Sequence, residues 1–155
     1  MVGDFAVGKT SLVARFVHSS FSDAYLSTVG VKVDTRSLAL PTGREIKLVI
    51  WDIAGTSALS TVERHYLQGA AGLILVADGT RAATLQVALD LERQSTAVLG
   101  QRPSVLLVNK ADLAGEWELD PDMPVPGREA IVCSARSGAG VEAAFARLAA
   151  ALAPG

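Results

Sequence analysis

Hydrophobic positions along this chain alternate between strand-like and helix-like spacing. Continuous apolar runs of strand length occupy residues 73–77, 105–108 and 130–133. Apolar residues at helical spacing predict helices over 10–17, 57–68, 82–99 and 141–152. Residues 31–40 and 46–51 predict a hairpin around the turn at 41–43. Strands that alternate with helices favour an α/β fold with a mostly parallel sheet covered on both faces.

Ligands of such folds bind at the carboxyl ends of the strands, where this chain carries its distinctive segments. Residues 3–10, GDFAVGKT, form a complete G-x-x-x-x-G-K-[ST] phosphate-binding loop. Gly3 and Gly8 permit positive φ, so that successive amides can turn inward around an anion, at the positive end of the helix that follows. Lys9 offers charge to the terminal phosphates and Thr10 offers a hydroxyl to Mg²⁺. By itself the loop fits any P-loop NTPase.

Two further segments narrow the nucleotide. Asp52 follows the second hairpin strand and can hold Mg²⁺ through water, although D-x-x-G, ending here at Gly55, is also a common turn. Residues 109–112, NKAD, follow the strand at 105–108. The Asp112 carboxylate can accept two hydrogen bonds from guanine, which adenine cannot donate there, and a site built on that pairing rejects the wrong base. Residues 134–136, SAR, can place a backbone amide against the guanine oxygen.

Composition agrees with a folded domain and argues against nucleic-acid binding and a membrane span. Of the 155 residues, 50% are apolar and 19% charged, so the chain can bury a core. A net charge of −2 without clustered Lys or Arg gives no electrostatic case for nucleic acid. No apolar stretch approaches the length of a membrane span, and we see no lipidation cysteine near the C-terminus. We expect no direct membrane anchor, a cytoplasmic location and a monomer, with Cys133 reduced in the core.

With these motifs in order, the chain resembles the Ras-like small GTPases, most closely a bacterial Rab-like GTP-binding protein. The residues WDIAG at 51–55 and YLQGAAG at 66–72 keep the spacing of the Rab-type branch. The resemblance implies a single small-GTPase domain over 1–155 with the three-layer P-loop NTPase fold. It also implies GTP/GDP and Mg²⁺ as ligands, switch segments at 25–31 and 55–66, and effector, exchange and GTPase-activating proteins as partners.

The resemblance assigns roles residue by residue. Thr28 joins Thr10 and Asp52 at Mg²⁺, and Phe21 braces the guanine edge. Lys9, Gly55 and Thr56 would act in hydrolysis. The full set expected to contact nucleotide is Gly3, Asp4, Phe5, Ala6, Val7, Gly8, Lys9, Thr10, Ser11, Phe21, Tyr25, Thr28, Gly55, Asn109, Lys110, Asp112, Ser134, Ala135 and Arg136.

Two departures from the family pattern bear on hydrolysis. Thr56 stands where the family usually has the glutamine that orients the attacking water, so we expect slow intrinsic hydrolysis that a partner protein could accelerate by about 10³–10⁵. Phe5 stands in the loop where small residues are usual. Its ring should obstruct an arginine inserted by a partner, unless it swings outward and packs on a switch.

Two other departures concern the fold. Three prolines within 116–127 forbid a regular helix where the family has one, and Trp117 there is expected to cover the sheet edge or to contact a partner. Only Met1 and Val2 precede the loop, where the family has a buried central strand. Losing several buried side chains at about 1.5–3 kcal/mol each suggests a misplaced start or a fragment. We still expect these two residues to enter the sheet.

The remaining candidates have structural explanations, and four functions stay open. His18 and His65 are expected at the surface or at helix ends, and Asp78 is expected to form a turn before Gly79. The leading hypothesis is a switch that hydrolyses GTP. The alternatives are a GTP-bound interaction module without hydrolysis, an ATP-using enzyme such as a small-molecule kinase, and a truncated chain that cannot fold alone.

Overall fold

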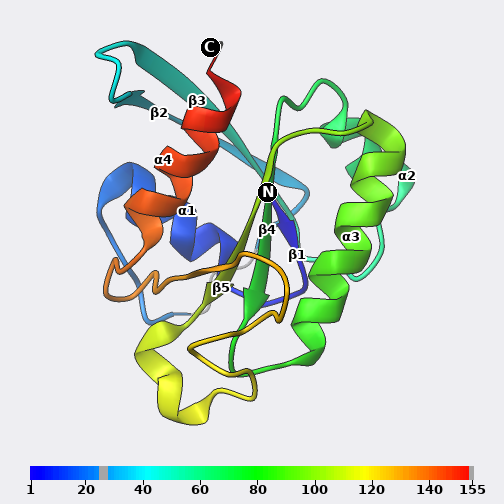
Figure 1. Ribbon diagram of the computed structural model, residues 1–155. Coiled ribbons are helices and arrows are strands. Elements are labelled where there is room, and N and C mark those ends of the chain that lie inside the picture. The colour runs from blue at the N-terminus through cyan, green and yellow to red at the C-terminus, as the bar shows by residue number, and fades with distance from the viewer. Residues whose placement is uncertain (25–27, 154–155) are drawn as a thin grey trace.

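A computed structural model describes residues 1–24 and 28–153, and it shows a sheet between two layers of helices (Figure 1). Its elements in chain order are β1 (Val2–Gly3), α1 (Lys9–His18), β2 (Val31–Ala39), β3 (Glu45–Ile53), α2 (Thr61–Leu67), β4 (Leu73–Asp78), α3 (Ala83–Leu99), β5 (Ser104–Asn109), the 3₁₀ helix η1 (Ala111–Glu116), β6 (Ile131–Val132) and α4 (Val141–Leu152). This order confirms the predicted α/β fold.

The strands form two ladders. One is a parallel sheet in the order β1-β4-β5-β6, and the other is the antiparallel hairpin of β2 and β3. The N-terminal residues join them, because β1 pairs with β4 at Val2 and Gly3, while the Met1 amine donates to the Trp51 carbonyl (2.9 Å) and the Ile53 amide donates to the Met1 carbonyl (3.2 Å). Met1 and Val2 therefore enter the sheet as expected.

Each face of the sheet carries its own core, as the buried apolar strands require. Helices α1 and α4 cover one face, where the rings of Phe16 and Phe145 stack with centroids 3.9 Å apart. Helices α2 and α3 cover the other, where Leu67 and Leu91 pack on the buried side chains of β4. Cys133 is fully buried, as expected. The two cores hold the carboxyl ends of β1, β4 and β5 together at the lower end of the molecule in Figure 1.

Most boundaries differ from the predicted ones by one or two residues, and three differences bear on the argument. The helix expected over 57–68 begins only at Thr61, because Ser60 and Glu63 form a capping box that fixes its first turn. Strand β3 extends through Ile53, so Asp52 lies inside the strand and not after it. The last strand contains only Ile131 and Val132 of the four residues predicted.

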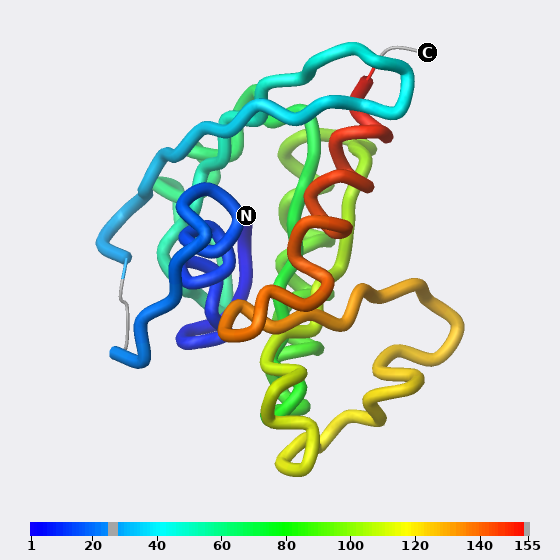
Figure 2. Tube along the Cα trace, turned by 90° about the vertical axis from the view of Figure 1, so that its left-hand side faces the viewer, coloured from blue at the N-terminus to red at the C-terminus, as the bar shows by residue number. Residues whose placement is uncertain are grey.

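Residues 117–128 contain no helix, which confirms the effect predicted for the three prolines. Figure 2 shows that the chain between β5 and β6 extends outward beside the carboxyl ends of the strands. Trp117 anchors the start of this segment, where its indole N–H donates to the Lys110 carbonyl (2.8 Å), and Arg128 anchors its end through two hydrogen bonds to Glu92 (2.6 and 2.7 Å). Trp117 therefore lies beyond the carboxyl ends of β4 and β5, against Gly79 and Lys110, and not along the sheet edge where we expected it.

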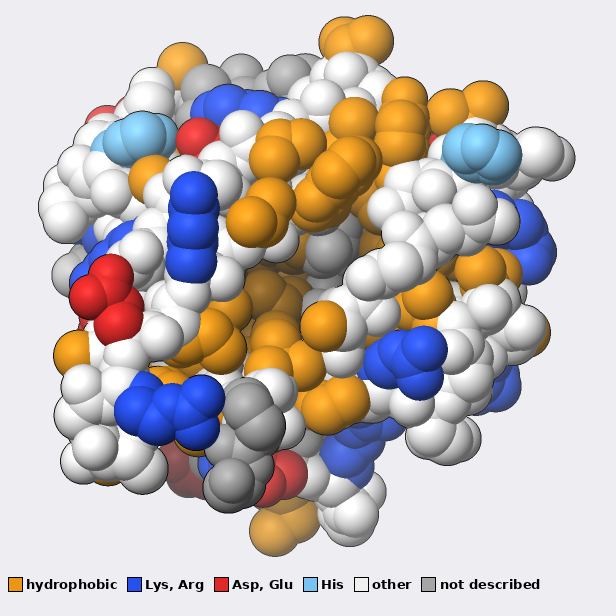
Figure 3. All heavy atoms as spheres, turned by 90° about the horizontal axis from the view of Figure 1, so that it is seen from above, with side chains coloured by type: hydrophobic (Ala, Val, Ile, Leu, Met, Phe, Trp, Pro, Cys, Tyr) orange, Lys and Arg blue, Asp and Glu red, His pale blue; other side chains and the backbone are white. Residues whose placement is uncertain are grey.

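The opposite end of the molecule has a different character. Figure 3 looks onto this end and shows hydrophobic side chains around a hollow in its middle.

The Met1 amine is buried, and burial lowers its pKa from 8.0 to about 5. Within residues 1–24 and 28–153, no helix is both long and apolar enough to cross a lipid bilayer.

Candidate functional site

A cavity of about 320 Å³ opens where β1, β4 and β5 end, and most of the predicted site residues meet in it. Those that line it are Phe5, Ala6, Gly8, Lys9, Thr10, Ser11, Phe21, Thr28, Gly55, Asn109, Lys110, Asp112, Ala135 and Arg136. Outside the lining, but hydrogen-bonded to residues that form it, are Gly3, Asp4, Val7, Asp52 and Ser134; Thr56 is also outside it and donates its amide to Gly3. Tyr25 lies outside the described residues.

The phosphate loop joins β1 to α1 in a conformation that needs its glycine. Gly8 has φ of +99°, and a Cβ there would lie 2.3 Å from the side-chain nitrogen of Asn109. The side chain of Lys9 folds back along the loop and donates to the Gly3 and Asp4 carbonyls, at 3.2 Å each. Burial lowers the pKa of Lys9, while the charges of Asp52 and Asp4 oppose that shift. The loop therefore presents a cation and the first turn of α1 to the cavity.

The predicted metal ligands lie together beside the loop. The Thr10 hydroxyl lies 2.5 Å from the Thr28 hydroxyl and donates to Asp52 Oδ2 at 2.6 Å, and Thr28 is 3.3 Å from the same oxygen. Asp52 is fully buried, and its Oδ1 has no hydrogen-bond partner among the described residues. A buried carboxylate without a full set of partners is costly. Two hydroxyls and this carboxylate form an oxygen donor set of the kind that Mg²⁺ prefers.

The other end of the cavity is built from the residues after β5 and β6. Asn109 ties three segments together, because its amide nitrogen donates to the Val7 carbonyl (3.0 Å) and its oxygen accepts from the Ala135 amide (3.1 Å). The Asp112 Oδ1 accepts from the Ser134 hydroxyl at 2.7 Å. This bond fixes the Asp112 carboxylate at the cavity lining, where it can accept hydrogen bonds from a planar ligand with adjacent N–H groups.

An arginine that our sequence reasoning missed supports this end. Arg15, on α1, donates to the Ala135 carbonyl (2.8 Å) and to the Arg136 carbonyl (2.5 Å). Arg136 in turn lies 5.8 Å from the Phe21 ring centroid, so a cation–π contact holds the aromatic at the rim. No spacing pattern marks Arg15, because the contact depends on how α1 packs beside the chain after β6.

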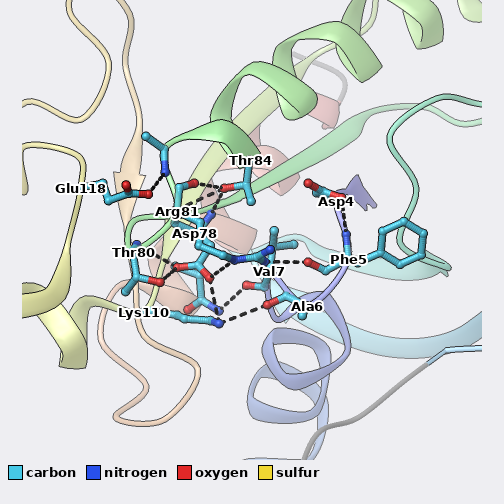
Figure 4. Close-up of polar contacts among 12 residues, drawn as sticks. Asp4, Phe5, Ala6, Val7, Asp78, Thr80, Arg81, Thr84, Lys110 and Glu118 are labelled. Carbon is cyan, nitrogen blue, oxygen red and sulfur yellow. Dashed lines mark hydrogen bonds and ion pairs between the residues drawn. The ribbon is translucent and has the colours of Figure 1, made fainter.

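The two residues that depart from the family pattern lie near the phosphate loop. The Thr56 amide donates to the Gly3 carbonyl (3.2 Å), and its hydroxyl donates to the Ala58 carbonyl (2.6 Å). The Thr56 side chain is thus engaged within its own loop. Phe5 is 59% exposed, and Figure 4 shows its ring pointing away from Asp78 and Lys110. The ring is exposed while Phe5 lines the cavity, so its exposure does not distinguish the two positions that the sequence left open.

Asp78 has a larger role than the turn we predicted. It does accept from the Thr80 amide (2.9 Å), as a turn former would. It is also fully buried and lies 2.9 Å from the Lys110 ammonium and 3.1 Å from the Arg81 guanidinium. The signal that could have revealed this is a carboxylate that directly continues the buried apolar run at 73–77.

Comparison with known proteins agrees with this geometry. A family model described as "Ras family" matches residues 1–153. Ras-related protein Rab-7L1 of Rattus norvegicus is 38% identical over 127 residues, which cover 79% of this chain and 62% of that protein. Ras-related protein Rab-13 of Canis lupus familiaris is 32% identical over 157 residues, covering 96% of this chain and 76% of that protein. Ras-related protein Rab-32A of Dictyostelium discoideum is 36% identical over 119 residues, covering 73% of this chain and 54% of that protein.

These matches show which family the chain belongs to and how much of its relatives' length it covers. The chain spans less than two thirds of the length of Rab-7L1, whereas the family model matches residues 1–153 of its 155. The matches include proteins named Rab, which confirms the predicted Rab-like character. The chain belongs to the Ras family of small GTPases.

Proposed function

We propose that this chain is a GTP-binding switch, a single domain that binds GTP or GDP with Mg²⁺ and hydrolyses GTP slowly. One observation carries the proposal: the buried Asp52 carboxylate, with one oxygen unpartnered, lies beside Thr10, Thr28 and the phosphate loop at one end of the cavity that has Asp112 at its other end. A single ligand with a triphosphate and a base bearing adjacent N–H groups satisfies both ends.

Each group of residues has a distinct task in this proposal. Lys9 and the amides of the loop bind the outer phosphates, and Thr10, Thr28 and Asp52 hold the metal. When bound, Mg²⁺ neutralises charge that develops on the phosphate oxygens. Asp112, Lys110 and the Ala135 amide select and orient guanine, with Phe21 at its edge.

Slow hydrolysis follows from the residues beside the outer phosphates. Gly55 would donate its backbone amide to the γ-phosphate, and Thr56 would have to orient the attacking water. The Thr56 hydroxyl already donates to the Ala58 carbonyl at 2.6 Å, and the threonine side chain is too short to replace a glutamine. Positioning and charge supply most of the catalysis of phosphoryl transfer, so a poorly oriented water slows the reaction without abolishing it.

Partners are proposed from the surface next to the site. Val33, Val49 and Trp51 are about half exposed on the outer face of the β2–β3 hairpin, and the Trp51 ring lies 6.4 Å from that of Tyr66 on α2. An apolar surface beside both switch segments suits an effector protein that binds one nucleotide state, and the same region would receive exchange and activating proteins. The cytoplasmic location and the monomeric state stay predictions.

A second candidate function is a GTP-bound interaction module without hydrolysis, which the engaged Thr56 hydroxyl favours. Single-turnover hydrolysis of bound GTP separates the two. The switch predicts slow release of phosphate that the Lys9→Ala variant abolishes, and the module predicts stable GTP over the same period. Rapid hydrolysis by the isolated wild-type chain would contradict both.

A further inference from the structure

The carbonyls of the phosphate loop are held one after another by side chains that reach them from other positions. Lys9 holds those of Gly3 and Asp4, and Asn109 holds that of Val7. The Ala6 carbonyl accepts from Lys110 at 3.1 Å. The carbonyl between them, that of Phe5, accepts from Arg81 Nη2 at 2.6 Å. All five carbonyls at positions 3–7 therefore have side-chain donors.

Arg81 can reach the Phe5 carbonyl because the buried Asp78 fixes the position of its side chain. Its Nε donates to Asp78 Oδ2 at 3.1 Å, while the Arg81 backbone amide donates to the Asp78 carbonyl at 3.0 Å. Asp78 is fully buried at the end of β4, and Figure 4 shows Arg81 and Lys110 converging on its carboxylate. Burial raises the pKa of Asp78, but the hydrogen bonds from Lys110, Thr80 and Arg81 together outweigh it and hold that pKa below its ordinary value.

The consequence for the loop is geometric. A peptide carbonyl and the next amide point in opposite directions, so a cation that holds the Phe5 carbonyl on one side turns the Ala6 amide to the other. Ala6 is held at a φ of +59°, a conformation that costs energy for a residue with a side chain. The Phe5 end of the loop is also where Lys9, the ligand of the outer phosphates, is tied to the Asp4 carbonyl.

We propose that Arg81 is a positioning residue for the phosphate loop: with the buried Asp78 as its base, it holds the Phe5 carbonyl outward and keeps the loop amides ready for the outer phosphates. The inference rests on the proposed function, since it concerns nucleotide held by that loop. Lys110 reaches the same carboxylate, so one buried aspartate supports both the loop and the segment that carries Asp112.

The test uses Arg81→Met, which keeps the length of the side chain but removes its donors. The matched control is Arg93→Met, because Arg93 forms an ion pair with Asp90 at the same i,i+3 spacing on α3, away from the loop. Amide hydrogen exchange is measured by residue with and without GDP and Mg²⁺, and GDP dissociation is followed with a fluorescent GDP. Arg81→Lys serves as the conservative variant.

The proposal predicts that Arg81→Met exchanges about tenfold faster at the amides of residues 5–8, with no change in α4, and releases GDP about tenfold faster. Arg81→Lys should restore most of both effects, and Arg93→Met should match wild type. Unchanged exchange in the loop, unchanged GDP release, or faster exchange throughout the protein would overturn it. Failure of wild type to bind GDP would instead contradict the proposed function, and this inference with it.

Discussion

At the level of a single residue, Asp52 carries the proposal of a metal site. A fully buried carboxylate with only two hydroxyl donors on one oxygen and none on the other is an expensive arrangement for a protein without a cation. Its burial beneath Thr10 and Thr28 therefore favours a metal role over a purely structural one.

Replacing that carboxylate separates metal binding from folding. We predict that Asp52→Asn weakens Mg²⁺-dependent GDP binding by about 10–100-fold, because the amide carries no charge to pair with the metal. Calorimetric titration of GDP with Mg²⁺ and with EDTA measures the effect. Without ligands, the variant should stay close to wild type in thermal stability, because the amide oxygen can still accept from the Thr10 and Thr28 hydroxyls. Unchanged dependence on Mg²⁺ would contradict the role, and Asp90→Asn serves as the exposed control.

Phe5 lines the cavity with a bulky side chain. We predict that Phe5→Gly hydrolyses GTP faster than wild type, alone or with an activating protein, because it opens the approach to the outer phosphates. Single-turnover phosphate release gives the comparison. Identical rates in both proteins under both conditions would rule out this role for the ring. The ring is exposed, so folding should change little.

At the level of elements, the segment between η1 and β6 stands where the family has a helix. Hydrogen bonds hold it at both ends, and one of its side chains caps the start of α3. Trp117 packs so closely on Gly79 that a Cβ there would lie 2.1 Å from the indole ring, and the Gly79 carbonyl accepts from the Glu118 amide at 2.9 Å. The Glu118 carboxylate in turn accepts from the Ala82 amide at the start of α3 (2.8 Å). The segment thus supplies the start of α3 with a partner that this helix lacks in its own N-cap side chain.

The indole hydrogen bond can be tested against the other tryptophan of the chain. We predict that Trp117→Phe lowers the free energy of unfolding by at least about 1 kcal/mol, since it removes the donor to the Lys110 carbonyl and replaces the indole that packs on Gly79 with a smaller ring. Trp51→Phe, at a side chain 43% exposed, should change it by less than about 0.5 kcal/mol. Urea unfolding of both variants provides the values. Equal effects would show that the Trp117 bond contributes nothing specific.

The elements were largely predictable, and the supporting contacts were not. Buried strands such as 105–108 and the phosphate loop carry local patterns that fix both their type and their place in the fold. The contacts of Arg15 and Arg81 were missed because each joins residues far apart in sequence, and nothing in a helix or turn marks an arginine whose partner is a backbone carbonyl. Asp78 was only half understood for the same reason.

At the scale of the whole molecule, the N-terminal residues join the hairpin to the parallel sheet at a cost. The Met1 amine has a pKa of about 5 in the fold and 8.0 when free. Unfolding therefore takes up a proton between these values, so the contribution of the amine makes stability rise as pH increases from about 5 to about 8 and is constant outside this window. The three-unit difference corresponds to as much as about 4 kcal/mol.

Thermal unfolding of the chain from pH 5 to pH 8 tests this expectation. The exposed His18 and His65 are replaced by glutamine in the background. We expect the midpoint to rise with pH and about one proton to be bound on unfolding near pH 6.5. A flat profile between pH 5 and pH 8 would show that the amine does not carry this cost.

The central claim concerns one ligand that reaches both ends of the cavity, and competition between nucleotides tests it most directly. Wild-type chain is loaded with fluorescent GDP and Mg²⁺ and challenged with GTP, GDP or ATP, with and without EDTA. The account predicts that GTP and GDP displace the probe, that ATP does not at a thousandfold higher concentration, and that EDTA speeds release. Equal displacement by ATP, or binding of the probe that is indifferent to EDTA, would contradict it.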